Sequence, residues 1–390
     1  MKLDKLFDSI NYVLKRKTNL YILKIQSFFS ISSRCLSHVS AFSVGNAGDN
    51  TLSSCVRQAF KVLGSIDSWK LISVYDSVSN KTIYNINRTK GLVIGGGGLF
   101  LPDTNKNNIS GWQWAISKNL LQEIKVPVIV YSVGFNYFRG QIPSELFKQN
   151  LLELVGKSSF FGLRNNGSVQ AVKELLPAEI KYKVVFQPCT TTIIRKISPW
   201  LENKRYNNSV CFNVAFDRED KRYGSSKELI LKQIAKSVCD IQSRGYDVYY
   251  IAHCKSDLLF VDYLPKGVVK IVDADGWNYK KLISFYNKID CVIGMRGHAQ
   301  MIPFGVNCEI ITLGSHDKMK WFLQDINALD WYIEISQDSE KLSRTIVNKF
   351  VDIHEKHGQI TRKRLKVEQD KLWEITCNNF KAIAEIIGAN

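Results

Sequence analysis

The sequence predicts an α/β protein with two doubly wound domains that face each other across a cleft. At 390 residues the chain exceeds the size at which a single hydrophobic core usually stops growing. Short apolar runs alternate with stretches of helical spacing, which is typical of a parallel sheet covered by helices. A polar segment at 195–208 interrupts this alternation, which then starts again. We therefore predict one domain on each side of that segment.

The first half contains the elements of one such domain. A short apolar run begins at Ser40 and ends in a glycine loop, and residues 51–63 show helical spacing. The run 126–133 is continuously apolar, as expected for a parallel strand buried on both faces. The remaining predictions are strands at 71–75, 91–95, 160–163 and 183–186 and helices at 112–124, 144–156 and 167–176.

The second half repeats this alternation. Strands are predicted at 210–214, 247–252, 291–294 and 309–313, and helices at 225–243, 278–288 and 299–305. The predicted domains span 41–195 and 209–350, between a basic N-terminal segment at 1–40 and a charged helical segment at 351–390. Two Rossmann-like halves that face a cleft make a GT-B-like fold, in which a ligand lies at the carboxyl ends of the strands.

The net charge of the chain indicates an anionic partner. Lys and Arg number 53 against 36 Asp and Glu, a formal charge of +17. Such an excess fits phosphate or carboxylate substrates, an anionic membrane face or nucleic acid. The sequence has no zinc-finger or RRM motif and its basic residues are spread over both halves. We therefore expect no specific nucleic-acid binding.

The cysteines and the N-terminal segment bear on location. The nine cysteines form no CxxC pair and no zinc-like cluster, so we expect a reduced cytoplasmic compartment and no metal or cofactor. Residues 1–34 carry seven Lys or Arg against two Asp, with apolar residues between them. This segment is either a peripheral anchor on the anionic inner face of the plasma membrane or a helix packed on the first domain. The sequence contains no apolar run long enough to span a membrane.

The loop before the first predicted helix is a candidate ligand site. Gly45 and Gly48 let the backbone approach a ligand, and the free N–H groups of the helix end, next to Asn46, suit an anion. Asp49 is either a base that deprotonates an attacking hydroxyl or an ordinary N-cap. Both interpretations place this loop at the carboxyl end of a strand.

A run of four glycines follows the predicted strand at 91–95. Within it, Gly96, Gly97 and Gly98 are candidates for close backbone contact with the donor, because four glycines are more than a tight turn requires. The run matches neither the dinucleotide fingerprint nor the Walker A loop. It therefore does not predict dinucleotide or ATP binding.

Basic residues follow several predicted strands. Arg296 offers a planar fork for a carboxylate or phosphate, and His298, two residues later, titrates near neutrality. Arg164, His253 and Lys318 each lie just beyond another strand end. Singly each is typical of a surface charge, but together they would make the cleft attractive to an anion.

These segments together resemble one protein family. The segments GNAGDN, GGGGL, LRNNGS, IAHCKSD and IGMRGHAQMIPFG, between about residues 43 and 325, are similar to those of the polysaccharide pyruvyl transferases. The resemblance implies a GT-B-like fold and transfer from phosphoenolpyruvate to sugar hydroxyls of a cell-surface polysaccharide or its lipid-linked precursor, giving a pyruvate ketal. It also implies that Arg296 and His298 form the Arg-x-His motif of the family, and that Arg164 and His253 match its arginine and histidine.

From these residues we hypothesise a mechanism without a cofactor. Arg296, Arg164 and Lys318 would bind the donor, His298 would act as general acid, and Asp49 or His253 would be the base.

Three alternatives stay open at this stage. A glycosyltransferase of the same fold would bind a nucleotide-sugar, with Asp273 or Asp275 holding the ribose. A nucleic-acid-binding protein would account for the charge alone. A family member without catalysis would serve as a scaffold for glycan assembly.

Overall fold

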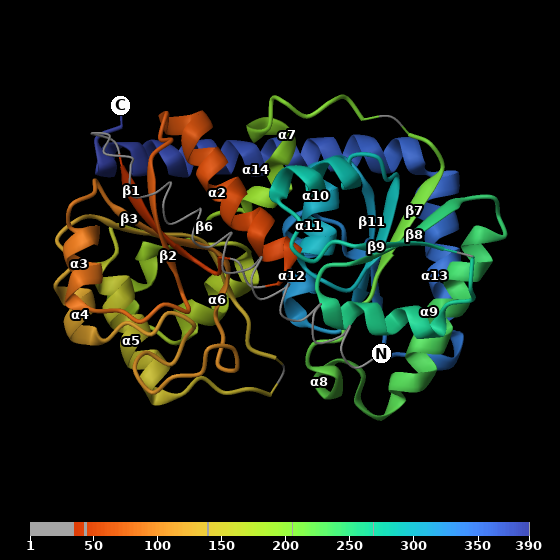
Figure 1. Cartoon of the computed structure of the whole chain (residues 1–390), viewed down its shortest axis with the longest axis horizontal. Helices are drawn as coiled ribbons and strands as arrows, with labels where there is room; N and C mark the ends of the chain where they lie inside the picture. Colours follow the sequence, from red (N-terminus) through yellow and green to blue (C-terminus); the bar gives the residue numbers. More distant parts are fainter. Residues whose placement is uncertain (1–34, 43–44, 139, 205, 268, 390) are drawn as a thin grey trace, which may run out of the picture.

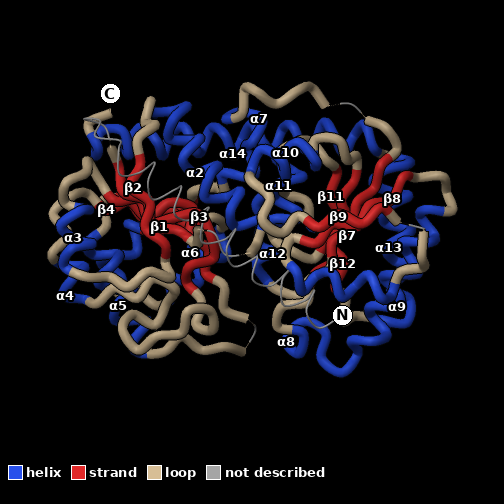
Figure 2. Tube along the Cα trace, in the orientation of Figure 1, coloured by secondary structure: helices blue, strands red, loops and turns tan. Residues whose placement is uncertain are grey.

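The computed structural model describes residues 35–389, except for 43–44, 139, 205 and 268. It contains two parallel sheets of six strands each, and helices cover both of them (Figure 2). The predicted two-domain α/β fold is thus confirmed. The basic segment at 1–34 lies outside the described residues.

The first sheet has the strand order β2-β1-β3-β4-β5-β6. Its centre is β4, in which all eight residues are buried because helices cover both faces. The strands are β1 (Leu36–Ser40), β2 (Trp69–Ser73), β3 (Leu92–Phe100), β4 (Val128–Phe135), β5 (Phe160–Leu163) and β6 (Val184–Phe186). The helices are α2 (Ala47–Gly64), α3 (Asn80–Ile86), α4 (Lys118–Gln122), α5 (Glu145–Lys157) and α6 (Asn166–Glu174).

The second sheet has the order β12-β11-β10-β7-β8-β9 and begins after α7 (Ile194–Ile197) and the segment 198–208. Its strands are β7 (Ser209–Asn213), β8 (Asp247–Ala252), β9 (Lys270–Asp273), β10 (Cys291–Gly294), β11 (Glu309–Gly314) and β12 (Tyr332–Glu334). Its helices are α8 (Glu219–Tyr223), α9 (Lys227–Gln242), α10 (Tyr279–Tyr286), α11 (His298–Gly305), α12 (Asp317–Asp325) and α13 (Leu342–Phe350).

The strand orders locate the ligand crevice. In each sheet the order reverses once, between β1 and β3 in the first and between β7 and β10 in the second. Connections on the two sides of such a point leave in opposite directions and open a crevice at the carboxyl ends of the strands. The Gly45 loop follows β1, and Arg296 follows β10. Both therefore lie at these switch points.

The C-terminal helix α14 (Gly358–Ile387) joins the two domains. Leu365 and Leu372 pack in the core of the second domain. Further along the helix, Phe380 and Ile383 pack against Phe60 of α2, in the first domain. Figure 1 shows α14 running along the same side of both sheets, after a π-helical segment at Val351–Lys356.

Several local predictions were wrong. The first strand is Leu36–Ser40 rather than the run that begins at Ser40, and the helix predicted at 112–124 is reduced to Lys118–Gln122. Trp112 and Trp114 are buried in the loop before α4, and their burial accounts for the apolar spacing that indicated a helix. Within the described part of the chain, no helix is both long enough and apolar enough to cross a membrane.

Candidate active site

A cavity of about 400 Å³ lies between the two domains. Residues of both switch points line it, together with the first turn of α2 and the start of α12. Ten of the residues singled out from the sequence meet here: Gly45, Asn46, Asp49, Gly97, Gly98, Arg164, His253, Arg296, His298 and Lys318. Gly48 and Gly96 are not among the lining residues.

The N-terminus of α2 contacts the second domain. Asn46 is its N-cap, and the Asn46 side chain accepts a hydrogen bond from the Gly48 N–H at 3.0 Å. The Ala47 N–H donates to the carbonyl oxygen of His253 at 3.0 Å. A Cβ atom at Gly48 would lie 2.6 Å from Cβ of His298, so glycine is required for this approach. The N-cap interpretation of Asp49 was therefore wrong, since Asn46 holds that position.

Asp49 and His298 form a pair across the two domains. Nδ1 of His298 lies 3.3 Å from Oδ1 of Asp49. Burial would lower the pKa of His298, but the hydrogen bond and charge of Asp49, helped by the Cys189 thiol, raise it. Burial would raise the pKa of Asp49, but His298 first, and then Arg164 and Lys318, lower it. Both shifts favour an imidazolium beside a carboxylate.

The glycine run lies within strand β3 rather than in a loop after it. A Cβ atom at Gly95 would lie 2.1 Å from the carbonyl oxygen of Tyr131 in β4, and one at Gly98 would collide with the Asn136 side chain. Gly96 and Gly97 have φ angles of +71° and +132°, a backbone conformation that residues with a side chain rarely adopt. The run therefore lets an irregular strand lie against its neighbour, with Gly97 and Gly98 at the cavity wall.

Arg164 extends into the cavity from the end of β5. Its guanidinium group occupies the space that a side chain at position 134 would need, because a Cβ on Gly134 would lie 2.3 Å from Nε of Arg164. Nη2 of Arg164 donates to Oδ1 of Asn136 at 2.7 Å, whereas Nε is buried without a partner among the described residues. Arg164 makes no ion pair in the described chain, so its charge is available to an anionic ligand.

Lys318 approaches the same region from the second domain, near the start of α12. Burial, followed by the positive charges of Arg222 and Arg164, lowers the pKa of Lys318 to about 7, although Asp217 opposes this shift. No acidic group of the described chain forms an ion pair with its ammonium group. Lys318 and Arg164 are therefore two uncompensated cations that line the cavity from different domains.

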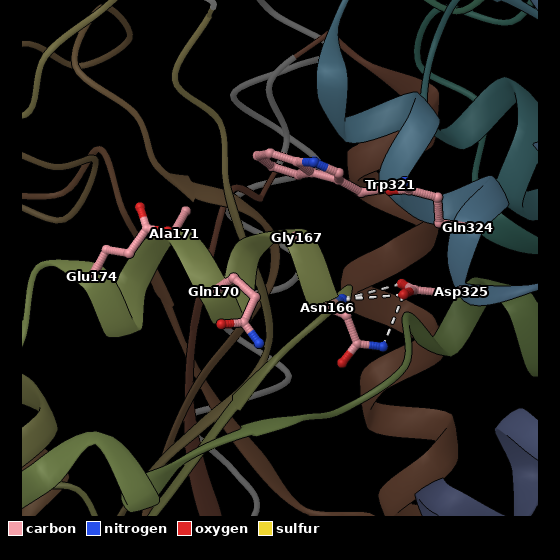
Figure 3. A pocket seen from close by; sticks show the side chains of 8 residues that line it. All are labelled: Asn166, Gly167, Gln170, Ala171, Glu174, Trp321, Gln324 and Asp325. Atoms are coloured by element: carbon pink, nitrogen blue, oxygen red, sulfur yellow. Dashed lines mark hydrogen bonds between the residues drawn. The ribbon is translucent and has the colours of Figure 1, made fainter.

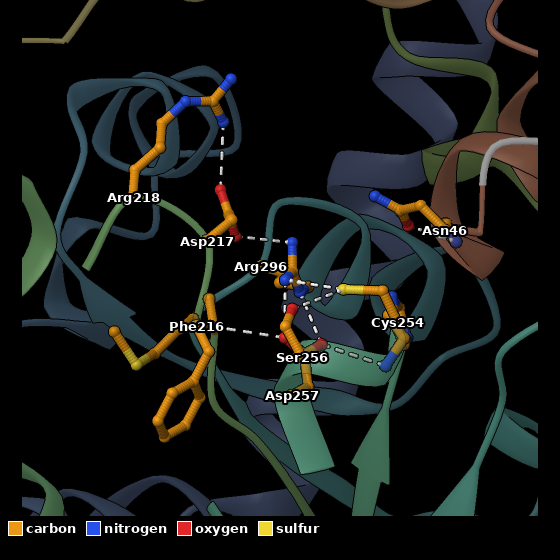
Figure 4. A network of polar contacts seen from close by, with 12 residues as sticks. Asn46, Phe216, Asp217, Arg218, Cys254, Ser256, Asp257 and Arg296 are labelled. Atoms are coloured by element: carbon orange, nitrogen blue, oxygen red, sulfur yellow. Dashed lines mark hydrogen bonds and ion pairs between the residues drawn. The ribbon is translucent and has the colours of Figure 1, made fainter. Parts of the chain in front are cut away.

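Arg296 lies in a network of carboxylates (Figure 4). Nε and Nη2 donate to the two carboxylate oxygens of Asp257 at 2.7 and 2.6 Å, and Nη1 lies 2.8 Å from Oδ1 of Asp217. Asp257 is fully buried. Burial would lower the pKa of Arg296, but the two carboxylates raise it well above its usual value. Arg296 is thus charged and already paired, unlike the freely available fork that its sequence position indicated.

His253 is buried and neutral. Its Nε2 lies 2.7 Å from the Tyr286 hydroxyl, and its backbone N–H donates to Asp257 at 3.1 Å. Burial first, and then the positive charge of Arg296 against the opposing effect of Asp257, lowers the pKa of His253 to about 3. The imidazole of His253 is therefore neutral near pH 7, and its Nε2 is engaged with Tyr286.

Sequence analysis missed the carboxylates that organise the second domain. Asp217 follows β7 and pairs with Arg222 at 2.9 Å and with Arg218 at 3.0 Å. The Asp257 carboxylate lies beside Arg296 in space, although the two residues are 39 positions apart in the sequence. Both acids follow strand ends of the second sheet, which is the signal that identified Arg296 and His253.

No cluster of three or more His, Cys, Asp or Glu side chains suited to a metal ion occurs among the residues that the structure describes. The cavity instead has five cationic lining residues against two acidic ones. This composition suits an anionic ligand.

The fold and the cavity together define a two-domain α/β enzyme of the GT-B type. One similar solved structure is UDP-GlcNAc 2-epimerase from Neisseria meningitidis bound to UDP-GlcNAc. Its TM-score is 0.53 and its sequence identity 11%, and the match covers 92% of this chain and 100% of that chain. Another is MnaA from S. aureus with UDP, with a TM-score of 0.51 and 11% identity over 82% of this chain and 88% of that chain. At this identity the likeness concerns the fold.

A comparison of the sequence with models of protein families identifies the family. The model of the polysaccharide pyruvyl transferase family matches residues 46–317, and the chain belongs to this family. It is therefore a transferase that acts on a polysaccharide. No curated protein sequence matches the chain.

Proposed function

We propose that the donor is phosphoenolpyruvate and that Arg164 and Lys318 bind its phosphate and carboxylate groups. The observation that carries this proposal is the presence of two uncompensated cations, one from each domain, in the cavity that the Asp49–His298 pair also lines. Backbone groups at Gly97 and Gly98, and the first turn of α2 at Gly45 and Asn46, complete the anion site. No cofactor takes part in this scheme.

The pair Asp49–His298 would carry the proton transfers. Asp49 takes the proton of one acceptor hydroxyl, whose oxygen bonds to the central carbon of the donor, while His298 gives its proton to the methylene carbon. A neighbouring hydroxyl then attacks the same carbon. The bond from this carbon to the phosphate oxygen breaks, phosphate leaves with the second hydroxyl proton, and a pyruvate ketal remains on the sugar.

Arg296 has a positioning role in this scheme. Its bonds to Asp257 and Asp217 fix the loop that begins α11, and His298 is the first residue of that helix. The charge of Arg296 is balanced by the two acids, so its contribution to donor binding is small beside that of Arg164. His253 contributes its carbonyl oxygen to the N-terminus of α2 and is not used as the base.

The acceptor is a cell-surface glycan or its lipid-linked precursor, modified in the cytoplasm. The basic composition of residues 1–34 supports contact with the inner face of the plasma membrane. A nucleotide-sugar donor has less support, because neither Asp273 nor Asp275 lines the cavity.

The donor is tested by comparing ligands on one protein sample. Phosphoenolpyruvate should raise Tm by linkage and UDP-GlcNAc should leave it unchanged. With a host glycan fraction, phosphate should be released in step with a glycan mass gain equal to a pyruvate ketal. Stabilisation by UDP-GlcNAc alone would overturn the assignment of the donor.

The proton-transfer pair is tested by substitution. Asp49→Asn and His298→Asn should each lower kcat by about 100- to 10,000-fold. The double variant should lose little more, because the two residues act as a unit. Tm should report intact folding in all three. Additive losses, or an active Asp49→Asn or His298→Asn variant, would contradict the assignment.

A further inference from the structure

The helices α6 and α12, which belong to different domains, contact each other beside a groove of about 660 Å³ (Figure 3). Each helix begins near one of the two uncompensated cations. Arg164 lies two residues before the first residue of α6, and Lys318 is the second residue of α12. The relative position of these two helices therefore sets the separation of the two cations.

A carboxylate forms the first part of this contact. The two carboxylate oxygens of Asp325, at the end of α12, each lie 3.2 Å from the backbone N–H of Asn166, and Oδ1 also accepts from Nδ2 of Asn166 at 2.9 Å. This N–H is at the start of α6, where it has no partner within the helix and where the helix dipole favours a negative charge. Asp325 thus binds the end of a helix in the other domain.

An aromatic ring forms the second part. A Cβ atom on Gly167 would lie 2.1 Å from Cγ and Cδ2 of Trp321, so the indole ring of α12 lies directly on the backbone of α6. In Figure 3 the Trp321 ring and Asp325 extend from one helix toward Gly167 and Asn166 of the other. A side chain at position 167 would separate the two helices.

These contacts oppose a repulsion at the other end of α12. Lys318 faces the positive charges of Arg222, Arg164 and Arg218, with Asp217 as the acidic group that offsets them. Of these three arginines only Arg164 belongs to the first domain, so it is the repulsion between Arg164 and Lys318 that favours a wider separation of the domains. Without an anion in the cavity, the contact of α6 with α12 acts against that separation.

We propose that the contact between α6 and α12 is a latch that fixes the separation of Arg164 and Lys318. Asn166, Gly167, Trp321 and Asp325 are then positioning residues for the donor, with no contact to it themselves. The proposal rests on the anion site of the proposed function and adds the interdomain contact that sets its width. An opened latch leaves both cations in place but too far apart to share one anion.

Two variants open the latch by independent means. Asp325→Ala removes the acceptor, and Gly167→Ala inserts a methyl group against Trp321 while favouring the helix itself. The matched control is Gln324→Ala, because Gln324 lines the same groove but takes part in neither contact. Asp325→Asn keeps one side-chain oxygen as acceptor and serves as the conservative variant.

The experiment measures inorganic phosphate binding by calorimetry and amide hydrogen exchange over residues 163–170 in the full-length protein. Both latch variants should weaken phosphate binding about 5-fold or more and speed exchange at Asn166, with little change in Tm. Asp325→Asn should regain part of the affinity, and Gln324→Ala should behave as wild type. In the transferase assay the latch variants should raise KM for the donor more than they lower kcat.

Three results would overturn the latch. Exchange at Asn166 that is unchanged in Asp325→Ala would show that the contact does not hold α6. Faster exchange with wild-type phosphate affinity would show that the contact does not position the cations. Weaker binding in Gln324→Ala would make the groove a ligand site. If the wild type bound no phosphate, the assignment of Arg164 and Lys318 would fail, while the exchange data would still decide whether the contact holds the domains together.

Discussion

Lys318 is a residue whose charge near neutral pH depends on its surroundings. Its pKa is lowered to about 7 by burial and by neighbouring arginines, so it gains a proton as pH falls through neutrality. An anion bound beside it favours the protonated form. Lys318 therefore links donor binding to pH.

Anion binding should weaken as pH rises above about 7. Sulfate, whose charge is constant in this range, should lose up to about tenfold in affinity per pH unit there, because Lys318 becomes neutral. Lys318→Arg should abolish this slope, since arginine stays charged. The measurement is calorimetry between pH 6 and pH 9, and the control is Lys320→Arg, an exposed position of the same helix. A slope that persists in Lys318→Arg would assign the pH dependence to another group.

The sequence predicted which residues lie at the cavity but not which residues they pair with. The places of Arg164, Arg296 and His298 at the cavity followed from one rule, that ligands bind at strand ends. The partners of Arg296 could not be predicted in this way, because Asp257 and Asp217 are distant from Arg296 in the sequence. Arg296 looked available in the sequence and is paired in the structure.

At the scale of elements, α14 is the helix with the most unexpected role. The sequence predicted a charged helical segment at 351–390 and did not indicate what it packs against. In the structure, the ring of Phe380 packs edge to face on the ring of Phe60 in α2, with the two ring centroids 5.0 Å apart, and it also contacts Gly64. The helix thus closes the core of the first domain with residues from the end of the chain.

Truncation of Phe380 should destabilise the whole protein. Phe380 is 3% exposed, so Phe380→Ala should lower the free energy of unfolding by about 3–5 kcal/mol. Urea denaturation measures this loss, and Lys381→Ala, its exposed neighbour, should change the free energy by less than about 0.5 kcal/mol. A loss below about 1 kcal/mol for Phe380→Ala would show that α14 is not part of that core.

Most strands and helices were predictable because their burial repeats with a regular period. Strand 291–294 matches its prediction, and α9 and α10 differ from theirs by a few residues. The glycine run was not predictable as part of a strand, because glycines normally disfavour strands. Close contact with Tyr131 of β4 accounts for it, and that contact exists only after the sheet has formed.

At the scale of the molecule, the two domains are held together around the cavity by contacts that differ in kind. Asp103 of the first domain binds Arg218 through two hydrogen bonds of 3.0 and 2.7 Å and also pairs with Lys221 at 3.2 Å. Arg218 has a φ angle of +55°, a strained conformation that persists where the surroundings hold it in place. This ion pair, the α2 contact and α14 connect the domains at separate points.

Loss of Asp103 should affect substrate binding more than stability. Asp103→Ala removes a partly exposed ion pair, which is worth at most about 1 kcal/mol of stability. It should nevertheless raise KM for donor and acceptor by about 5-fold, because the closed arrangement becomes less populated. Steady-state kinetics measures this, and small-angle scattering should show a larger radius of gyration. Asp247→Ala, which breaks the Lys270 pair within the second domain, is the control and should leave both unchanged.

The sequence by itself determined the two-domain α/β fold, the family and most of the residues at the cavity, because strand and helix patterns and strand-end positions are local properties of the chain. The tertiary structure alone decided which charges are compensated. Arg296 pairs with Asp257, Lys318 comes within range of the positive charge of Arg164, and Asp325 binds Asn166 only when distant segments are folded against each other. Electrostatic energies depend on distances in space and on burial, and neither can be read from sequence order.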